Sequence, residues 1–304
     1  MTVPGIPNNF ALSTTCFGTR LRSIEDQAFA AVAMGFRQIE LGLSDAPPTM
    51  NGFEDTQRET GVRLTSIVAG CLKPRSDKAP PPSLSSSSAE EREQALGSAR
   101  RHIQVAQRLG APIVVVRGSS VADSKLHQEA EALHARRARE GWSDELGEEM
   151  RAFVQRVQKK GQRQVEHLCR SLHELLQEFP ETKLALEPGG QIDDLLTFEA
   201  MGWVLDDLEH VSYWHDVGRV HMRQRCGLPG QGRWLETYAA RMIGVHLQDA
   251  AEMEAEMPPG QGEVDFKLVA EYTPKNAVKV LEIDQRHGRT EILASVQFLT
   301  DLGF

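Results

Sequence analysis

Four short apolar stretches in the second half of the chain each end in a residue that can bind a divalent metal ion. They read KLALE at residues 183–187, VSYWHD at 211–216, MIGVH at 242–246 and KVLE at 279–282. They recur about every 30 residues, the spacing of one strand plus one helix in an eight-unit barrel. Because an unpaired charge at the end of a buried strand is costly, four such ends favour one shared partner, and a divalent cation is the simplest.

Strand and helix patterns also alternate along the rest of the chain, as in a parallel sheet covered by helices. Eight strands are expected, which matches a closed barrel. We therefore predict the α/β class and a single (β/α)₈ TIM-barrel domain over residues 1–304. The expected strands span residues 10–16, 37–43, 62–70, 112–117, 182–187, 211–216, 242–247 and 278–283.

Two segments exceed the needs of a plain barrel. Residues 72–88 are rich in Pro and Ser and predict a mobile loop after strand three. Residues 121–160 predict a helical insertion after strand four, with helical patterns over 124–140 and 144–178 and a break near Gly161. Active sites in such barrels lie at the carboxyl ends of the strands, so the insertion should lie near the site as a lid, a subunit contact or a solvated charged helix.

Composition excludes several classes of protein. No apolar run approaches the ~20 residues that a membrane helix needs, and the first residues do not resemble a signal peptide. The four cysteines are widely scattered, which favours free thiols and a cytoplasmic location. A net charge of −9 argues against a nucleic-acid partner but leaves a small anionic substrate open.

Five short motifs carry a resemblance to a known family. They are ALEP at 185–188, HDVG at 215–218, HLQD at 246–249, PGQGEVDF at 259–266 and LE at 281–282. In their order and spacing the chain resembles the xylose-isomerase-like TIM barrels, the sugar phosphate isomerase/epimerase family. The resemblance implies that one metal ion is held by Glu187, Asp216, His246 and Glu282.

Alternation along a strand leaves one choice open, because His215 and Asp216 cannot both face the barrel interior. The resemblance selects Asp216 and leaves His215 as a buried structural histidine. Three carboxylates and an imidazole suit Mn²⁺, Mg²⁺ or Co²⁺, with Zn²⁺ as an alternative. The competing interpretation of the four residues is a set of salt bridges to Lys and Arg at the barrel mouth.

Glu187 and Glu282 are the candidate catalytic residues. With a metal polarising the substrate carbonyl, one glutamate would remove the proton from the neighbouring carbon and form an enediolate. Return of the proton to the adjacent carbon makes an isomerase, and return to the opposite face makes an epimerase. Elimination from the same enediolate would instead make a lyase or dehydratase acting on a keto-sugar or keto-acid.

Three further residues are candidates for substrate contact. The family usually has Asp-x-x-His after strand six, whereas this chain has Arg219 at the histidine position. An arginine there suits a carboxylate or phosphate. Arg117 and Glu40, at the ends of strands four and two, are the other two, although either arginine could instead pair with an acid such as Glu40. Asp249 is expected to orient His246.

We therefore expect a metal-dependent isomerase or epimerase acting on a small sugar or keto-polyol, and an arginine facing the substrate would suit an acidic or phosphorylated one. No Gly-x-Gly-x-x-Gly follows an early strand, so no nucleotide cofactor is expected. A non-catalytic sugar-binding barrel and an endonuclease IV-type nuclease are the remaining alternatives. The family often forms dimers or tetramers, so a homo-oligomer is a further expectation.

Overall fold

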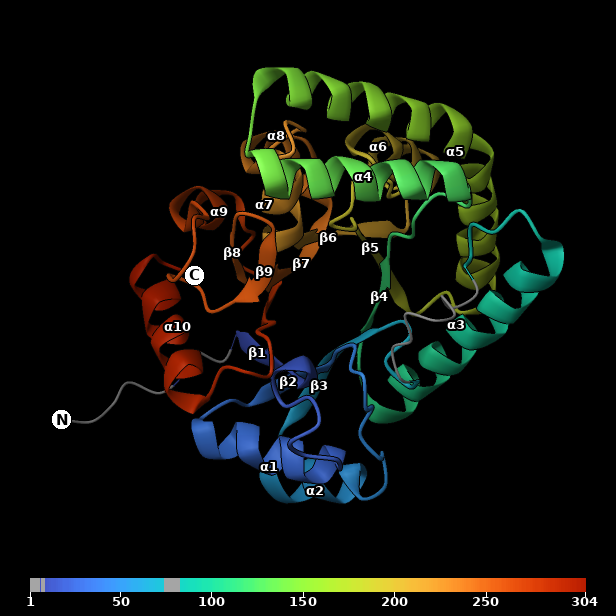
Figure 1. Ribbon diagram of the computed structural model, residues 1–304. Helices are drawn as coiled ribbons and strands as arrows, with labels where there is room; N and C mark the ends of the chain where they lie inside the picture. The colour runs from blue at the N-terminus through green and yellow to red at the C-terminus, as the bar shows by residue number, and fades with distance from the viewer. Residues whose placement is uncertain (1–5, 7–8, 74–82) are drawn as a thin grey trace.

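Eight parallel strands close into a barrel in the computed structural model, which describes residue 6 and residues 9–73 and 83–304 (Figure 1). The predicted barrel and all eight predicted strands are confirmed. Around the barrel the strand order is β1-β10-β7-β6-β5-β4-β3-β2. The strands are β1 (Phe10–Ser13), β2 (Gln38–Leu41), β3 (Arg63–Val68), β4 (Ile113–Arg117), β5 (Lys183–Glu187), β6 (Val211–Asp216), β7 (Met242–Leu247) and β10 (Val278–Leu281).

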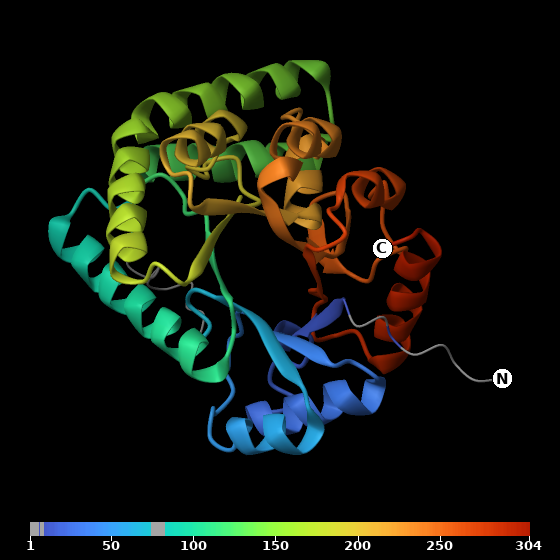
Figure 2. The ribbon, with the colours of Figure 1, turned by 180° about the vertical axis from the view of Figure 1, so that it is seen from behind.

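Helices surround the barrel on its outer side (Figure 2). Most follow a strand and return the chain to the start of the next one, as parallel strands require. They are α1 (Ile24–Met34), α2 (Phe53–Thr60), α3 (Ala89–Leu109), α4 (Ser124–Glu140), α5 (Asp144–Glu178), α6 (Phe198–Asp207), α7 (Val217–Arg225), α8 (Gln231–Tyr238), α9 (Phe266–Tyr272) and α10 (Arg289–Asp301). Within the described ranges no helix is long and apolar enough to span a bilayer.

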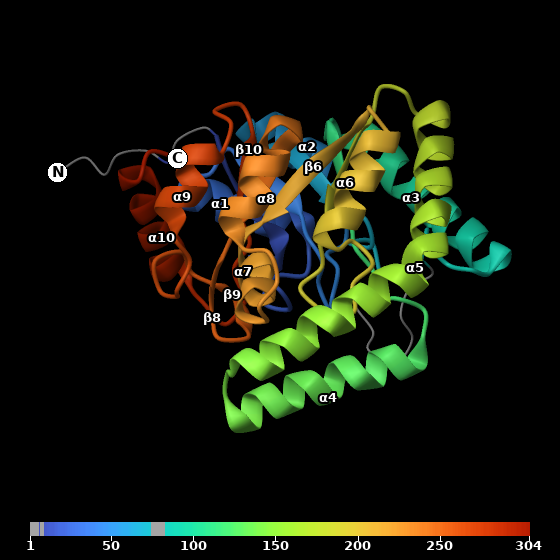
Figure 3. The ribbon, with the colours of Figure 1, turned by 90° about the horizontal axis from the view of Figure 1, so that it is seen from above.

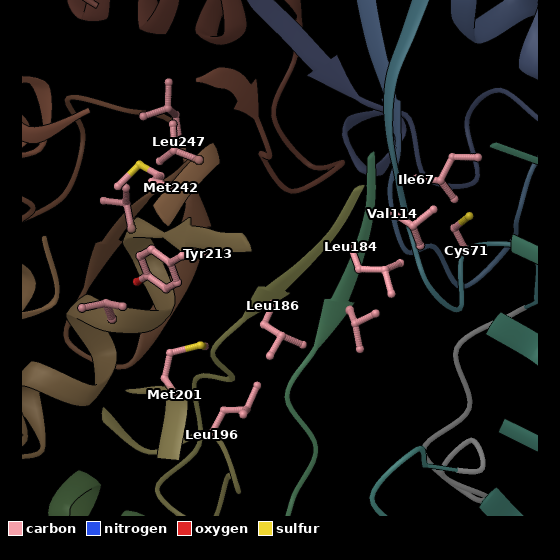
Figure 4. Packing of buried hydrophobic residues seen from close by; sticks show 14 of the residues in the cluster. Ile67, Cys71, Val114, Leu184, Leu186, Leu196, Met201, Tyr213, Met242 and Leu247 are labelled. Carbon is pink, nitrogen blue, oxygen red and sulfur yellow. The ribbon is translucent and has the colours of Figure 1, made fainter. Parts of the chain in front are cut away.

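Alternation of side chains along the strands divides the core into two parts. The larger cluster fills the layer between barrel and helices, and Val114, Leu184 and Leu186 belong to it (Figure 4). A smaller cluster fills the barrel interior below the strand ends. Its buried members are Ala11, Val68, Ile113, Val115, Ala185, Trp214 and Val280.

The insertion after strand four is present as two antiparallel helical segments, α4 and the first part of α5 (Figure 3). The predicted break near Gly161 is wrong, because α5 is one continuous helix of 35 residues. The helix changes direction along its length instead, as Figure 3 shows. A Cβ atom at Gly161 would lie 2.4 Å from Leu195 Cδ2, so the glycine allows the loop between β5 and α6 to approach α5 closely.

A two-stranded hairpin after β7 was not predicted from the sequence. Its strands, β8 (Asp249–Ala251) and β9 (Glu254–Met257), are antiparallel. They are too short to show a period of two in the sequence. Arg137 of α4 lies 3.6 Å from Glu252 at the hairpin turn, so the insertion packs over the carboxyl end of the barrel.

The predicted mobile loop 72–88 lies partly outside the described residues, which omit 74–82. Its last residue, Ser88, is the N-cap of α3 and accepts a hydrogen bond from the backbone N–H of Glu91. All four cysteines lie in the described part of the chain and are free thiols, as predicted.

Gly244 is the position at which barrel packing is easiest to test. A Cβ atom there would lie 2.1 Å from the Trp214 ring, which fills the barrel interior. We expect Gly244→Ala to lower the free energy of unfolding by about 1–3 kcal/mol through overpacking, measured by urea denaturation. The control is Gly232→Ala in α8, where the nearest atom to a new Cβ is 3.7 Å away and stability should be equal or higher. Equal stability of both variants would contradict this packing.

Candidate metal centre

Four potential metal ligands meet at the carboxyl end of the barrel. They end β5 and β6, lie within β7, or directly follow β10, and each is completely buried. One ligand atom from each residue can be chosen so that all lie within 4.8 Å of one another. The four residues are Glu187, Asp216, His246 and Glu282.

Strand alternation places these side chains as the sequence predicted. In β6, Trp214 fills the barrel interior and Asp216 follows it on the same face, whereas His215 points away. His215 lies between the Tyr213 hydroxyl at 2.6 Å and Gln231 Oε1 at 2.7 Å. Burial lowers the pKa of His215 to about 4, so this histidine is neutral and structural.

His246 is held by the carboxylate of Glu40, which lies 206 residues earlier in the sequence. Its Nε2 atom lies 3.0 Å and 3.1 Å from the two oxygens of Glu40, which also accepts a 2.7 Å hydrogen bond from Ser66 Oγ. Such a partner fixes the tautomer and the orientation of a metal-binding imidazole. With the proton on Nε2, the Nδ1 atom faces the ligand cluster.

Glu40 therefore has a different environment from the one predicted. We expected it to contact a substrate, but it is fully buried and bonds to His246. We expected Asp249 to orient His246, and that expectation is corrected too. The oxygens of Asp249 accept hydrogen bonds from the backbone N–H groups of Gly260, Gly262 and Val264, so Asp249 shapes the loop after the hairpin.

Both predicted arginines reach the cluster. Arg117 donates from Nε to Glu187 at 2.8 Å and from Nη2 to Glu282 at 2.6 Å. Arg219, in the first turn of α7, donates from Nε to Asp216 at 2.8 Å, and the same atom lies 3.2 Å from Glu187 Oε1. The salt bridges weighed in the sequence analysis are thus present, made to the ligand residues themselves.

Gln248 was not recognised as a site residue from the sequence. Its Nε2 atom donates to Asp216 Oδ2 at 2.9 Å and to Glu282 Oε2 at 3.1 Å. Its Oε1 atom accepts from the backbone N–H of Glu256 at 2.6 Å, which ties the hairpin to the cluster. The signal that could have found it is alternation, because Gln248 lies two residues after His246 and directly follows the end of β7.

The charges of the cluster shift the pKa of its members. Burial would raise the pKa of Glu187 and Glu282, but the combined attraction to Arg117, His246 and Arg219 outweighs it, so that the pKa of Glu187 falls well below its usual range and that of Glu282 to about 2. For Asp216, burial and the neighbouring glutamates raise the pKa to about 8 despite a nearby guanidinium. Burial lowers the pKa of His246, yet the surrounding carboxylates raise it well above its usual value. The cluster therefore retains protons that a cation would displace.

Two orphaned atoms show that the residues fit a cation. Among the described residues, Glu187 Oε1 and His246 Nδ1 are buried without a hydrogen bond, although Oε1 also lies 3.2 Å from the Nε atom of Arg219. They lie 3.4 Å apart, inside the cluster. An unpartnered buried polar group costs about 1–3 kcal/mol. A divalent cation at the four residues would satisfy both atoms, and three carboxylates with one imidazole suit Mn²⁺, Mg²⁺, Co²⁺ or Zn²⁺.

Comparison with known proteins agrees with this geometry. Residues 28–301 match the protein family described as xylose isomerase-like TIM barrel. No curated protein sequence matches the chain.

Solved structures resemble the chain over almost its full length. A D-tagatose 3-epimerase-like protein has a TM-score of 0.67 at 15% identity, covering 96% of both chains. D-psicose 3-epimerase with D-tagatose, from Clostridium cellulolyticum H10, has a TM-score of 0.66 at 13% identity, covering 96% of this chain and 98% of the other. A xylose isomerase-like TIM barrel protein from Mycobacterium smegmatis, in complex with magnesium, has a TM-score of 0.56 at 13% identity, covering 96% and 95%. At these identities the similarity establishes the fold.

The contact between Glu40 and His246 yields a test of the cluster. We expect Glu40→Gln to weaken Mn²⁺ binding roughly 10-fold or more, because the neutral amide holds the imidazole less firmly. Isothermal titration calorimetry measures the affinity, and circular dichroism checks the fold. The control is Glu236→Gln on the exposed side of α8, which should bind Mn²⁺ like the unmodified protein. Unchanged affinity in Glu40→Gln would remove Glu40 from the site.

Proposed function

The chain belongs to the xylose isomerase-like TIM barrel family, and on that premise we propose that it binds one divalent metal ion and isomerises or epimerises a small sugar-like keto compound. One observation carries the proposal. Ligand atoms of Glu187, Asp216, His246 and Glu282 converge within 4.8 Å, fully buried, at the end of the barrel where active sites of this fold lie.

The similar structures support the class of substrate and the metal. Two of them are described as a 3-epimerase or as epimerase-like, and the third was determined with magnesium. We propose the same kind of chemistry for this chain because its four ligand residues have the donor set that such a metal needs.

A bound metal ion would polarise the substrate carbonyl and stabilise the negative charge that develops on its oxygen. Glu187 and Glu282 would move the proton. Both are ionised at neutral pH, because Arg117, His246 and Arg219 together hold their pKa values below the usual range despite burial. In the barrel order, β6 and β7 separate the strands that carry them, so they approach a substrate from different sides.

The position to which the proton returns decides the reaction. One glutamate would take the proton from the carbon beside the carbonyl. Its return to the adjacent carbon gives an isomer, and its return by the other glutamate to the opposite face of the same carbon gives an epimer. The complete burial of both carboxylates keeps bulk water away from the proton in transit.

Metal binding is the first test of this proposal. Protein loaded with Mn²⁺ should contain about one ion per chain by elemental analysis, and His246→Ala should lose most of its affinity. Because the imidazole must lose its proton to bind the ion and its pKa is raised, affinity should weaken as pH falls through the neutral range. Calorimetry in buffers of different ionisation enthalpy should show release of a proton. An ion bound equally well by His246→Ala would place the metal elsewhere.

Proton transfer is the second test. In deuterium oxide, the Mn²⁺-loaded protein should exchange a carbon-bound proton of a ketose for deuterium. NMR measures this exchange for a panel of keto-sugars with and without a carboxylate. Glu187→Gln and Glu282→Gln should each lower the rate roughly 10²-fold or more while leaving the fold intact. The exposed substitution Glu236→Gln serves as the control. Turnover of a ketose without any exchange would argue for a hydride shift instead.

A further inference from the structure

A cavity of about 350 Å³ adjoins the metal centre and has two unlike sides. Arg117 and Arg219 line it where it meets the ligand cluster. The rest of its described wall is mainly apolar and comes from β4, the loops after β2, β3, β4 and β5, the segment before α3, and the helices α3 and α5. The large apolar residues in that wall are Leu43, Leu84, Val116, Leu168, Leu195 and Leu196.

The two arginines retain hydrogen-bond donors that the carboxylates do not use. Nη1 of Arg117 is buried and has no hydrogen-bond partner among the described residues. Arg219 uses its Nε atom for Asp216, and its Nη2 atom lies 4.0 Å from the carboxylate of Glu256. The side chains of Arg117 and Arg219 are only 10% and 18% exposed, so these donors lie largely out of water.

The proximity of these two cations has an electrostatic consequence. Both guanidinium groups contact Glu187, at 2.8 Å from Nε of Arg117 and 3.2 Å from Nε of Arg219, so like charges lie close together in a region of low dielectric. An anion bound to their remaining donors would satisfy the orphaned Nη1 of Arg117. Planar guanidinium forks are suited to the two oxygens of a carboxylate.

The polar groups elsewhere in the wall are largely occupied. Nε2 of His102 accepts the backbone N–H of Gly70 at 3.0 Å, and its Nδ1 lies 2.8 Å from the carbonyl oxygen of Ser98. The hydroxyls of Ser83 and Ser119 bond to each other at 3.0 Å. Among the described residues of the wall, the hydroxyl groups of a polyol would find few free partners, which is unfavourable, whereas an apolar group would gain by burial.

Building on the proposed function, we propose that the substrate is a small keto acid that keeps the carbonyl and the neighbouring exchangeable C–H of that reaction and ends in an apolar group. Its carboxylate binds between Arg117 and Arg219, and its apolar part occupies the adjoining cavity. The carbon that exchanges its proton then lies toward Glu187 and Glu282. This assignment deepens the general preference for an anionic substrate that Arg219 suggests, because the mainly apolar described lining disfavours a fully hydroxylated sugar acid.

Calorimetric binding of four probes to the Mn²⁺-loaded protein tests this assignment. We expect 4-methyl-2-oxopentanoate to bind more tightly than pyruvate, which lacks the apolar group, by roughly 10-fold or more. It should also bind more tightly than D-tagatose and than 4-methyl-2-pentanone, which keeps the apolar body and the ketone but has no carboxylate. Equal affinity for D-tagatose or for the neutral ketone would overturn the proposal.

Substitutions at Arg219 and Leu43 test the charged side and the apolar side of the cavity separately. Arg219→Gln should weaken the binding of both keto acids by 10-fold or more, and Arg219→Lys should retain part of that affinity. Leu43→Ala should weaken the binding of 4-methyl-2-oxopentanoate and leave the affinity for pyruvate unchanged. The control is Arg233→Gln, which removes an exposed arginine of α8 outside the cavity and should change the affinity for neither keto acid. Unaltered keto acid binding in Arg219→Gln would remove the arginine from the site.

Competition with inorganic phosphate tests whether the two arginines bind a phosphate group instead of a carboxylate. Displacement of 4-methyl-2-oxopentanoate by phosphate at equal concentration would assign the arginines to a phosphate group and overturn the carboxylate assignment. The Mn²⁺ titration of the same sample keeps the two proposals apart. Metal binding with proton exchange but no keto acid preference would refute this inference alone, whereas failure to bind metal would refute the proposed function.

Discussion

Four carboxyl groups, those of Glu40, Glu187, Asp216 and Glu282, are fully buried together at the mouth of the barrel. Removing one such charge from water without compensation is among the most costly events in folding. The surrounding residues are arranged to provide that compensation. Arg117 bridges two of the glutamates, and a protonated or metal-bound His246 lies among all four groups.

The barrel makes this concentration of charge geometrically possible. Parallel strands bring their carboxyl ends to one edge, and alternation directs every second side chain inward. Below the charged layer, Trp214 fills the barrel interior and requires a glycine at position 244 on the neighbouring strand. The apolar cluster around Trp214 thus packs beneath the charged layer. Gln248 connects that layer to the β8–β9 hairpin.

The same arrangement gives the site two distinct halves. On one side the carboxylates and the imidazole form a hard, oxygen-rich cluster suited to a divalent cation. On the other side, the guanidinium groups of Arg117 and Arg219 separate the cluster from an apolar cavity. Arg219 therefore places a permanent cation between the ligand cluster and the apolar part of the cavity wall.

The sequence by itself determined the strands and the bounds of α4 and α5. These features depend on local periodicity and capping, which act over a few residues. Alternation left the choice between His215 and Asp216 open, and the family resemblance selected Asp216. Only the tertiary structure decided the pairing of Glu40 with His246, 206 residues apart, and of Arg117 with Glu187 and Glu282, 70 and 165 residues away. Barrel closure between β1 and β10 brings the first strands beside the last, and no local pattern encodes which side chains then meet. The β8–β9 hairpin and the continuity of α5 at Gly161 were likewise decided by packing, because short strands and a single glycine carry too weak a local signal.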